Sequence, residues 1–179
     1  TPVVTWPAPA PITFGTPLGG SQLNASADVP GTFTYSPVSG TVLNAGANQP
    51  LSVNFIPTNS GNYNSVSNTT AQITVTRATP VITWSQPAAI TYGMPLGATQ
   101  LNATASTAGT FTYSPASATI LNAGTNQVLS VNFTPSNSTN FNSVSGTTTL
   151  INVNKATPVV TWNNPSTISY GTLLSAAQL

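Results

Sequence analysis

The stretch LSVNFIPTNSGNYNSV, residues 51–66, decides the fold of this chain. Its first five residues alternate between apolar and polar side chains, which places Leu51, Val53 and Phe55 on one face. A period of two is typical of a strand with one buried face. A proline-containing turn follows the strand, and the loop after the turn carries Tyr63.

The same stretch returns as LSVNFTPSNSTNFNSV over residues 129–144, an offset of 78 residues. Aligning residues 1–78 with residues 79–156 needs no gap, and 51 of the 78 positions are identical. Residues 157–179 match the start of a third copy. A fixed period of this length predicts a tandem array of small domains. We name them repeat 1 (1–78), repeat 2 (79–156) and an incomplete repeat 3 (157–179). The period suits a compact β-sandwich.

Short runs of alternating side chains, bounded by Pro, Gly and Asn, fill the rest of each repeat. In repeat 1 they predict strands at residues 3–6, 12–14, 22–26, 32–36, 41–43, 51–55 and 71–76. This pattern is typical of an antiparallel Greek-key sandwich of the immunoglobulin-like type. The alternative is a β-grasp-like unit with a helical turn over residues 17–25, which Gly19 and Gly20 disfavour. We expect Gly15 to adopt a backbone conformation closed to other residues.

The joints between repeats are short and contain proline, at residues 77–80 and 155–158. Proline fixes one backbone dihedral and holds the preceding residue extended. We therefore predict an elongated, semi-rigid rod rather than domains on a flexible linker. Arg77 and Lys155 occupy equivalent places beside the joints. One interpretation is a hydrogen bond across the repeat interface, and the favoured one is a solvated surface cation.

The composition excludes several classes of function. Asp28, Arg77 and Lys155 are the only charged side chains, and the chain has no Glu, His or Cys. Acid–base or nucleophilic catalysis cannot be assembled from one Asp, so we predict no enzymatic activity. The same lack of ligands predicts no metal and no cofactor. The absence of a basic patch argues against a nucleic-acid partner, and the absence of a long apolar run argues against a membrane span.

The aromatic residues allow two interpretations. Trp6, Trp84 and Trp162 each follow a Val or Ile run beside a joint, where a ring either packs inside the protein or stacks on a sugar. We favour packing, and a carbohydrate-binding module that uses these three residues is the alternative function. Tyr63 is equivalent to Phe141, which has no hydroxyl, so we interpret both rings as core plugs rather than tyrosine corners.

The equivalent residues Phe14, Tyr92 and Tyr170 receive the same interpretation, because again only the ring is shared between the copies. The near-zero net charge of +1 gives weak repulsion between molecules and favours association. The expected partners are therefore neighbouring repeats of the same chain, with other copies of the chain in a filament as a further candidate.

Several motifs carry a likeness to one repeat type: Ile90-Thr91-Tyr92-Gly93, Gly109-Thr110-Phe111-Thr112-Tyr113-Ser114-Pro115, Ala123-Gly124, Asn140-Phe141 and Lys155-Ala156-Thr157-Pro158. The whole chain resembles bacterial Ig-like repeats, closest to the group-3 and YGX (MBG) type. The resemblance implies tandem arrays in very large secreted or surface-anchored bacterial proteins. Many relatives carry an acidic residue before the Asn-aromatic pair. This chain has none there, so the resemblance does not extend to calcium stiffening.

We therefore expect a structural spacer in an extracellular or cell-surface bacterial stalk, adhesin shaft or self-assembling fibre. Such a spacer supplies length and stiffness rather than chemistry. Residues 157–179 hold too few strands for a sandwich. They are either part of a longer array or strands donated to another molecule. We favour the first explanation, because repeat 1 already carries its own equivalent strands over residues 3–14.

Overall fold

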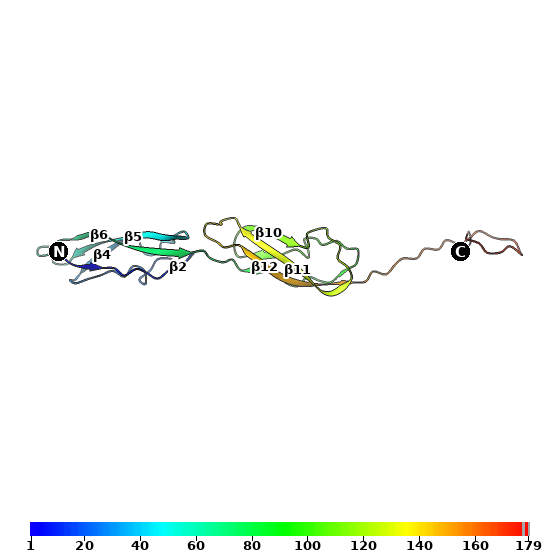
Figure 1. The fold of residues 1–179 in the computed structure, drawn as a ribbon, viewed down its shortest axis with the longest axis horizontal. Helices are drawn as coiled ribbons and strands as arrows, with labels where there is room; N and C mark the ends of the chain where they lie inside the picture. The colour runs from blue at the N-terminus through cyan, green and yellow to red at the C-terminus, as the bar shows by residue number, and fades with distance from the viewer. Residues whose placement is uncertain (177, 179) are drawn as a thin grey trace.

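The computed structural model describes residues 1–176 and 178, and it is all-β, with no helix among those residues. The predicted all-β class is confirmed. The two repeats lie end to end, and the residues after 156 lead away from the far end of repeat 2 (Figure 1). Within the described part, no helix could cross a membrane. Ala177 and Leu179, which belong to the predicted third copy, lie outside the described residues.

Residues 1–78, all of which are described, form β1 (Val4–Thr5), β2 (Ile12–Thr13), β3 (Ser26–Ala27), β4 (Gly31–Ser36), β5 (Gly46–Pro57) and β6 (Val66–Thr76). Repeat 2 forms β7 (Ile82–Thr83), β8 (Ile90–Thr91), β9 (Thr104–Ala105), β10 (Gly109–Ser114), β11 (Gly124–Pro135) and β12 (Val144–Asn154). Each strand of repeat 2 begins 78 residues after its counterpart. The two copies of the sequence therefore fold in the same way.

Each repeat consists of a four-stranded sheet and a two-stranded sheet. In repeat 1 the larger sheet has the order β2-β6-β5-β4, and the smaller sheet pairs β1 with β3. Most pairs are antiparallel as predicted, but β2 runs parallel to β6, and β8 runs parallel to β12. The antiparallel prediction is wrong at this edge. Almost the whole repeat separates β2 from β6, so no hairpin turn imposes the antiparallel sense.

The central strands extend well beyond the predicted runs. β5 has 12 residues and β6 has 11. Their register shifts between Gly46 and Gln49, where Asn48 adopts a φ of 53°. It shifts again between Val53 and Phe55. Such bulges let a strand continue its ladder while bending.

Two short runs that we predicted as strands are not strands. The 41–43 run makes one isolated bridge, to Pro17. The 22–26 run starts at the end of a turn, in which the backbone N–H of Leu23 donates to the carbonyl of Gly19 over 2.8 Å, and residues 24–25 have no regular structure. β3 begins only at its last residue. A single turn therefore stands where the β-grasp alternative needs a helix.

The core of each repeat lies on the predicted face of its central strand. Leu51, Val53 and Phe55 are at most 1% exposed. Gly31 is required here, because a side chain at this position would overlap the Phe55 ring. Gly15 has a φ of +96°, so its predicted special conformation is confirmed. Each repeat has its own apolar cluster, so the two cores are separate.

The third copy forms turns but no strands among the described residues after 156. Gly171 has a φ of 88°, close to the value at Gly15. Leu174 is 61% exposed, whereas the equivalent Leu18 and Leu96 are 1% exposed. Turn geometry is encoded locally, but a strand needs a partner to pair with and a core to cover.

Candidate functional site: the junction between the repeats

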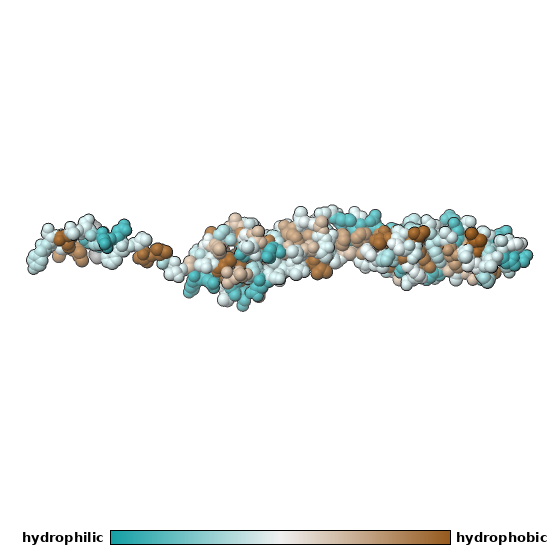
Figure 2. All heavy atoms as spheres, turned by 180° about the vertical axis from the view of Figure 1, so that it is seen from behind, coloured by the Kyte–Doolittle hydropathy of each residue, from teal (hydrophilic) through white to brown (hydrophobic). Residues whose placement is uncertain are grey.

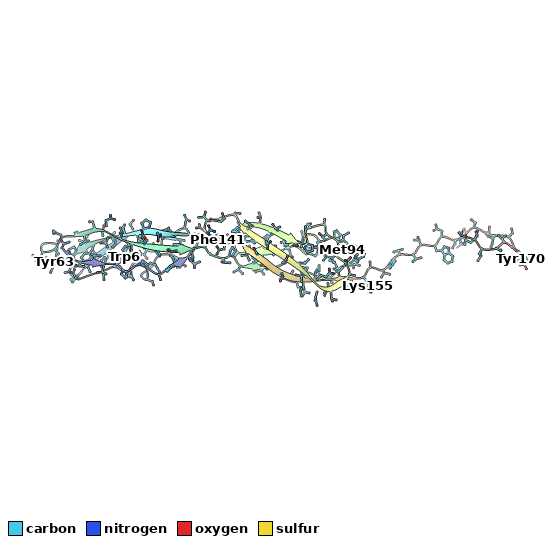
Figure 3. The ribbon with its side chains drawn as sticks, viewed as in Figure 1. Trp6, Tyr63, Met94, Phe141, Lys155 and Tyr170 are labelled. Carbon is cyan, nitrogen blue, oxygen red and sulfur yellow. The ribbon has the colours of Figure 1, made fainter. Side chains whose placement is uncertain are left out.

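The two repeats meet where a loop of repeat 2 reaches the end of repeat 1. This loop, residues 139–142, follows β11 and is called the repeat 2 plug; its equivalent, residues 61–64, is the repeat 1 plug. The residues that receive the repeat 2 plug form the repeat 1 socket: Phe14, Asn44, Ala45, Arg77 and Ala78. Figure 3 shows Phe141 of the plug at the boundary between the repeats.

Asn140 is the buried polar residue at the centre of the junction, with an exposure of 5%. Its Oδ1 accepts a hydrogen bond from the backbone N–H of Ala45 over 2.7 Å. Its Nδ2 donates to Oδ1 of Asn44 over 3.0 Å. A carboxamide carries its acceptor and its donors on two separate atoms, so Asn140 bonds to both partners at once. A buried amide without partners costs about 1–3 kcal/mol, so the docking that buries Asn140 depends on both of these hydrogen bonds.

Backbone hydrogen bonds close the joint beside Asn140. The N–H of Ala78 donates to the carbonyl of Asn140 over 2.9 Å, and the N–H of Asn142 donates to the carbonyl of Ala78 over 2.8 Å. Nδ2 of Asn142 also donates to Oγ1 of Thr79 over 3.0 Å. Ala78 is the last residue of repeat 1. Repeat 2 therefore holds the segment of chain that leads into it.

An aromatic pair covers one side of the junction. The rings of Phe14 and Phe141 meet edge to face, with centroids 5.3 Å apart and planes at 79°. Both were predicted to plug the core of their own repeat, and this prediction is wrong. The plug loop projects from the end of the sheet, so its ring is half-buried against the neighbouring repeat. Without such a neighbour, Tyr63 is 41% exposed and Tyr92 is 51% exposed.

Arg77 contributes a hydrogen bond across the junction although it is exposed. Its Nε donates to the carbonyl of Thr139 over 3.2 Å. The hydrogen bond across the repeat interface, which was the less favoured interpretation, is therefore observed for Arg77, while its side chain stays exposed as the favoured interpretation expects. Side-chain type alone does not show which carbonyl lies within reach. Lys155, the equivalent residue, lies at the far end of repeat 2 (Figure 3).

The three candidate tryptophans lie in two kinds of environment. Trp6 and Trp84 are half-buried, and each Nε1 donates to a backbone carbonyl over 3.0 Å. Each ring meets a tyrosine ring, Tyr35 or Tyr113, edge-on at 5.3 Å. These two indoles pack inside their repeats. Trp162, in the third copy, is 73% exposed.

A tyrosine does bond its hydroxyl to the backbone, but it is not Tyr63. The hydroxyl of Tyr35 accepts a hydrogen bond from the N–H of Ala25 over 3.0 Å, and Tyr113 does the same with Ala103. Both copies keep a tyrosine at this position, whereas Tyr63 becomes Phe141. That difference is the signal that could have located the hydroxyl-dependent residue.

Sequence reasoning also missed the three residues at the centre of the junction, Asn44, Ala45 and Asn140. A signal for them exists, because both copies contain the segments LNAG, at residues 43–46, and NSV after an Asn-aromatic pair. Core packing explains why apolar residues recur in two copies. It does not explain identical polar residues in loops, which a shared contact between repeats does explain.

The junction offers binding and positioning but no reactive chemistry. Arg77 is the one charged side chain among its residues, and no carboxylate or thiol lies there. Elsewhere in residues 1–176 and 178, no cluster of His, Cys, Asp and Glu that could hold a metal ion is found. No protein-family model matches the chain, and no curated protein matches it either. The junction is therefore the feature of the molecule from which a function can be inferred.

Proposed function

We propose that this chain is a structural spacer made of immunoglobulin-like β-sandwich repeats, in an extracellular bacterial stalk, adhesin shaft or fibre. Its task is to supply length and stiffness. The observation that carries the proposal is the buried amide of Asn140, whose two ends bond to Ala45 and Asn44 of the preceding repeat. Because hydrogen bonds are directional, one relative position of the repeats satisfies both ends.

The joint itself supports stiffness. Ala78 exchanges two backbone hydrogen bonds with the plug of repeat 2, and Pro80 is buried. The segment that joins the two repeats is therefore held in place by hydrogen bonds to repeat 2. A flexible linker would instead leave its backbone groups to water. The resemblance to bacterial Ig-like repeats supports the extracellular placement.

The surface supports a spacer rather than a recognition module. On the face seen in Figure 2, apolar residues are scattered along the rod and do not merge into one continuous band. Isolated apolar residues on a surface need no partner, whereas a large patch marks a docking site. Ser, Thr and Asn keep this nearly uncharged surface wetted.

Distances between spin labels test the stiffness directly. The chain has no cysteine, so Thr32→Cys and Thr112→Cys place one label on each repeat, at exposed positions of β4 and β10. We expect a single narrow distance distribution. Adding Asn140→Ala should broaden it, whereas the matched control Asn62→Ala should not. A broad distribution in the chain without Asn140→Ala would contradict the spacer function.

Insensitivity to pH is a second test. Asp28 has the only carboxylate side chain, and it accepts a hydrogen bond from the N–H of Val3 rather than taking part in the junction. Between about pH 4 and 9, where Asp, Glu and His side chains usually titrate, the junction therefore has no group to switch. We expect the maximum dimension from small-angle scattering to stay constant over this range. A large change would count against a spacer.

Carbohydrate binding is the alternative function, and one observation favours it. Trp162 is 73% exposed, as an aromatic platform for a sugar needs to be. Trp6 and Trp84 offer less, because their rings pack on Tyr35 and Tyr113. Titration with soluble polysaccharides while following tryptophan fluorescence tests this alternative. A spectral shift that Trp162→Ala abolishes would support it, and no shift would exclude these rings.

A further inference from the structure

The end of repeat 2 repeats the socket of repeat 1 with its contacts open. A pocket of about 300 Å³ is lined by Tyr92, Asn122, Ala123, Lys155 and Ala156. In the same order, these are the equivalents of Phe14, Asn44, Ala45, Arg77 and Ala78, the residues that hold the repeat 2 plug. Ala45 and Ala78 are half-buried, whereas Ala123 and Ala156 are exposed. We call this set the repeat 2 socket.

A matching plug is exposed at the opposite end of the molecule. Residues 61–64 (Gly-Asn-Tyr-Asn) are the equivalents of residues 139–142 (Thr-Asn-Phe-Asn). Asn62 and Asn64 are exposed, and Tyr63 is 41% exposed, whereas Asn140 is 5% exposed. Tyr63 lies at one tip of the rod and Lys155 lies at the far end of repeat 2 (Figure 3).

We propose that the repeat 2 socket binds the repeat 1 plug of a second copy of this chain, head to tail. This inference rests on the proposed function of the junction as the device that positions successive repeats. The junction already present in the molecule identifies the occupant, because the contacts of its plug and socket have counterparts in this new pair.

The central amide finds the same partners. Oδ1 of Asn62 accepts from the N–H of Ala123, and Nδ2 of Asn62 donates to Oδ1 of Asn122. Ala156 exchanges two backbone hydrogen bonds with the plug, as Ala78 does with residues 140 and 142. Because Asn62 is identical to Asn140, the donor and acceptor pattern needs no adjustment.

Two contacts change in residue type but keep their chemistry. Tyr63 meets Tyr92 where Phe141 meets Phe14, and both phenol hydroxyls start from exposed residues that already contact water. The ammonium of Lys155 donates to the carbonyl of Gly61 where Arg77 donates to Thr139. A lysine offers three donors to a single carbonyl, which is sufficient for this contact.

The segment after the socket leaves room for the incoming copy. Residues 157–170 are exposed and belong to no strand. No strand pairing therefore has to break for this segment to turn aside from Ala156 when the second copy docks. The plug and the socket lie on different surfaces, so the contact is heterologous. Such a contact does not close on itself, and repeated use generates an open filament.

The association between copies is weak because it lacks the covalent joint. Within one chain the two halves of the junction are held at a high effective concentration, whereas between chains they meet by diffusion. We therefore expect self-association at high protein concentration, and growth along the rod axis rather than compact dimers.

Sedimentation and small-angle scattering over a concentration series of the full chain test the proposal. The average mass and the maximum dimension should rise together. Tyr63→Ala with Asn62→Ala, and separately Tyr92→Ala with Asn122→Ala, should each raise the dissociation constant at least about tenfold. Tyr63→Phe should preserve association, because repeat 2 already uses Phe141. Asn24→Ala, at an exposed loop residue, is the matched control and should change nothing.

A mixing experiment decides whether the contact is heterologous. The plug variant keeps an intact socket, and the socket variant keeps an intact plug, so an equal mixture should form one-to-one pairs that grow no further. Association that neither variant weakens, or a chain that stays monomeric at all concentrations, would overturn the proposal. A monomeric chain that keeps its narrow label-to-label distance would still leave the spacer function standing.

Discussion

The ends of repeat 1 and repeat 2 are built from nearly the same residues, yet one end is covered and the other is open. Pro80 is buried at the first joint, and the equivalent Pro158 is exposed at the second. Each repeat therefore carries a plug and a socket. Each of these is covered only where a neighbouring repeat docks against it. The effect of a substitution at the covered end can therefore be compared with the effect of the equivalent substitution at the open end.

The largest effect is expected when repeat 2, which covers the repeat 1 socket, is unfolded by a core substitution. Phe133→Ala deletes a ring that is 1% exposed in the core of repeat 2 and should cost about 3–5 kcal/mol. The free energy of unfolding of a small repeat without disulfides is only slightly larger than this loss. Repeat 2 should therefore unfold while repeat 1 stays folded. The amide of Ala45, which bonds to Asn140, should then exchange with solvent as fast as that of Ala123.

Amide exchange followed by nuclear magnetic resonance measures this outcome. The amides in the core strands of repeat 1 should stay protected, because its apolar cluster is separate. The matched variant Phe55→Ala unfolds repeat 1 and should leave the exchange of Ala123 unchanged. Simultaneous unfolding of both repeats would contradict the picture of two separate cores.

The next effect is the loss of the central amide. Asn140→Ala removes the partner of Asn44 and Ala45 and should cost about 1–3 kcal/mol in the docking of the repeats. Asn62→Ala makes the same chemical change at the exposed plug and should not change unfolding of dilute protein. Denaturant unfolding of both variants measures the difference. Equal effects at the two sites would show that the amide stabilises its own loop rather than the junction.

Local periodicity accounts for the parts of the fold that could be predicted. The alternation of residues 51–55 encodes a buried face, and the position of Gly15 encodes a left-handed backbone. Both depend on a few neighbouring residues. The third copy makes the same point, because Gly171 adopts its turn while Leu174 stays exposed.

The junction and the sheet edge could not be predicted in the same way. The contact between Phe14 and Phe141 joins residues of different repeats, and the parallel pairing of β2 with β6 joins the two ends of one repeat. Periodicity shows that a ring is apolar and that a strand has a face. It does not show which distant surface covers them. The aromatic rings of the plug and socket were therefore assigned to the core of their own repeat, although Phe14 and Phe141 meet at the junction.

A smaller effect is expected from the aromatic pair. Phe141→Leu keeps an apolar side chain but loses the edge-to-face contact with Phe14, which should cost about 0.5–1.5 kcal/mol. Tyr63→Leu changes the exposed plug and should leave the stability of dilute protein unaltered. Thermal unfolding of the two variants, recorded at low concentration to prevent self-association, measures the contrast. A destabilised Tyr63→Leu variant would show that the ring packs within its own repeat.

The smallest effect is expected from Arg77→Lys. This change gives the repeat 1 socket the lysine that the repeat 2 socket already has at position 155. The hydrogen bond from Nε of Arg77 to Thr139 is exposed to solvent, so water competes for both partners. Lysine reaches a carbonyl with a single flexible ammonium and loses more rotamer freedom in doing so. The melting temperature should fall by about 1 °C or less, and the label-to-label distance should not change. A larger fall would mean that the guanidinium positions the plug, and the repeat 2 socket, which has Lys155, would then bind a plug less well than the repeat 1 socket does.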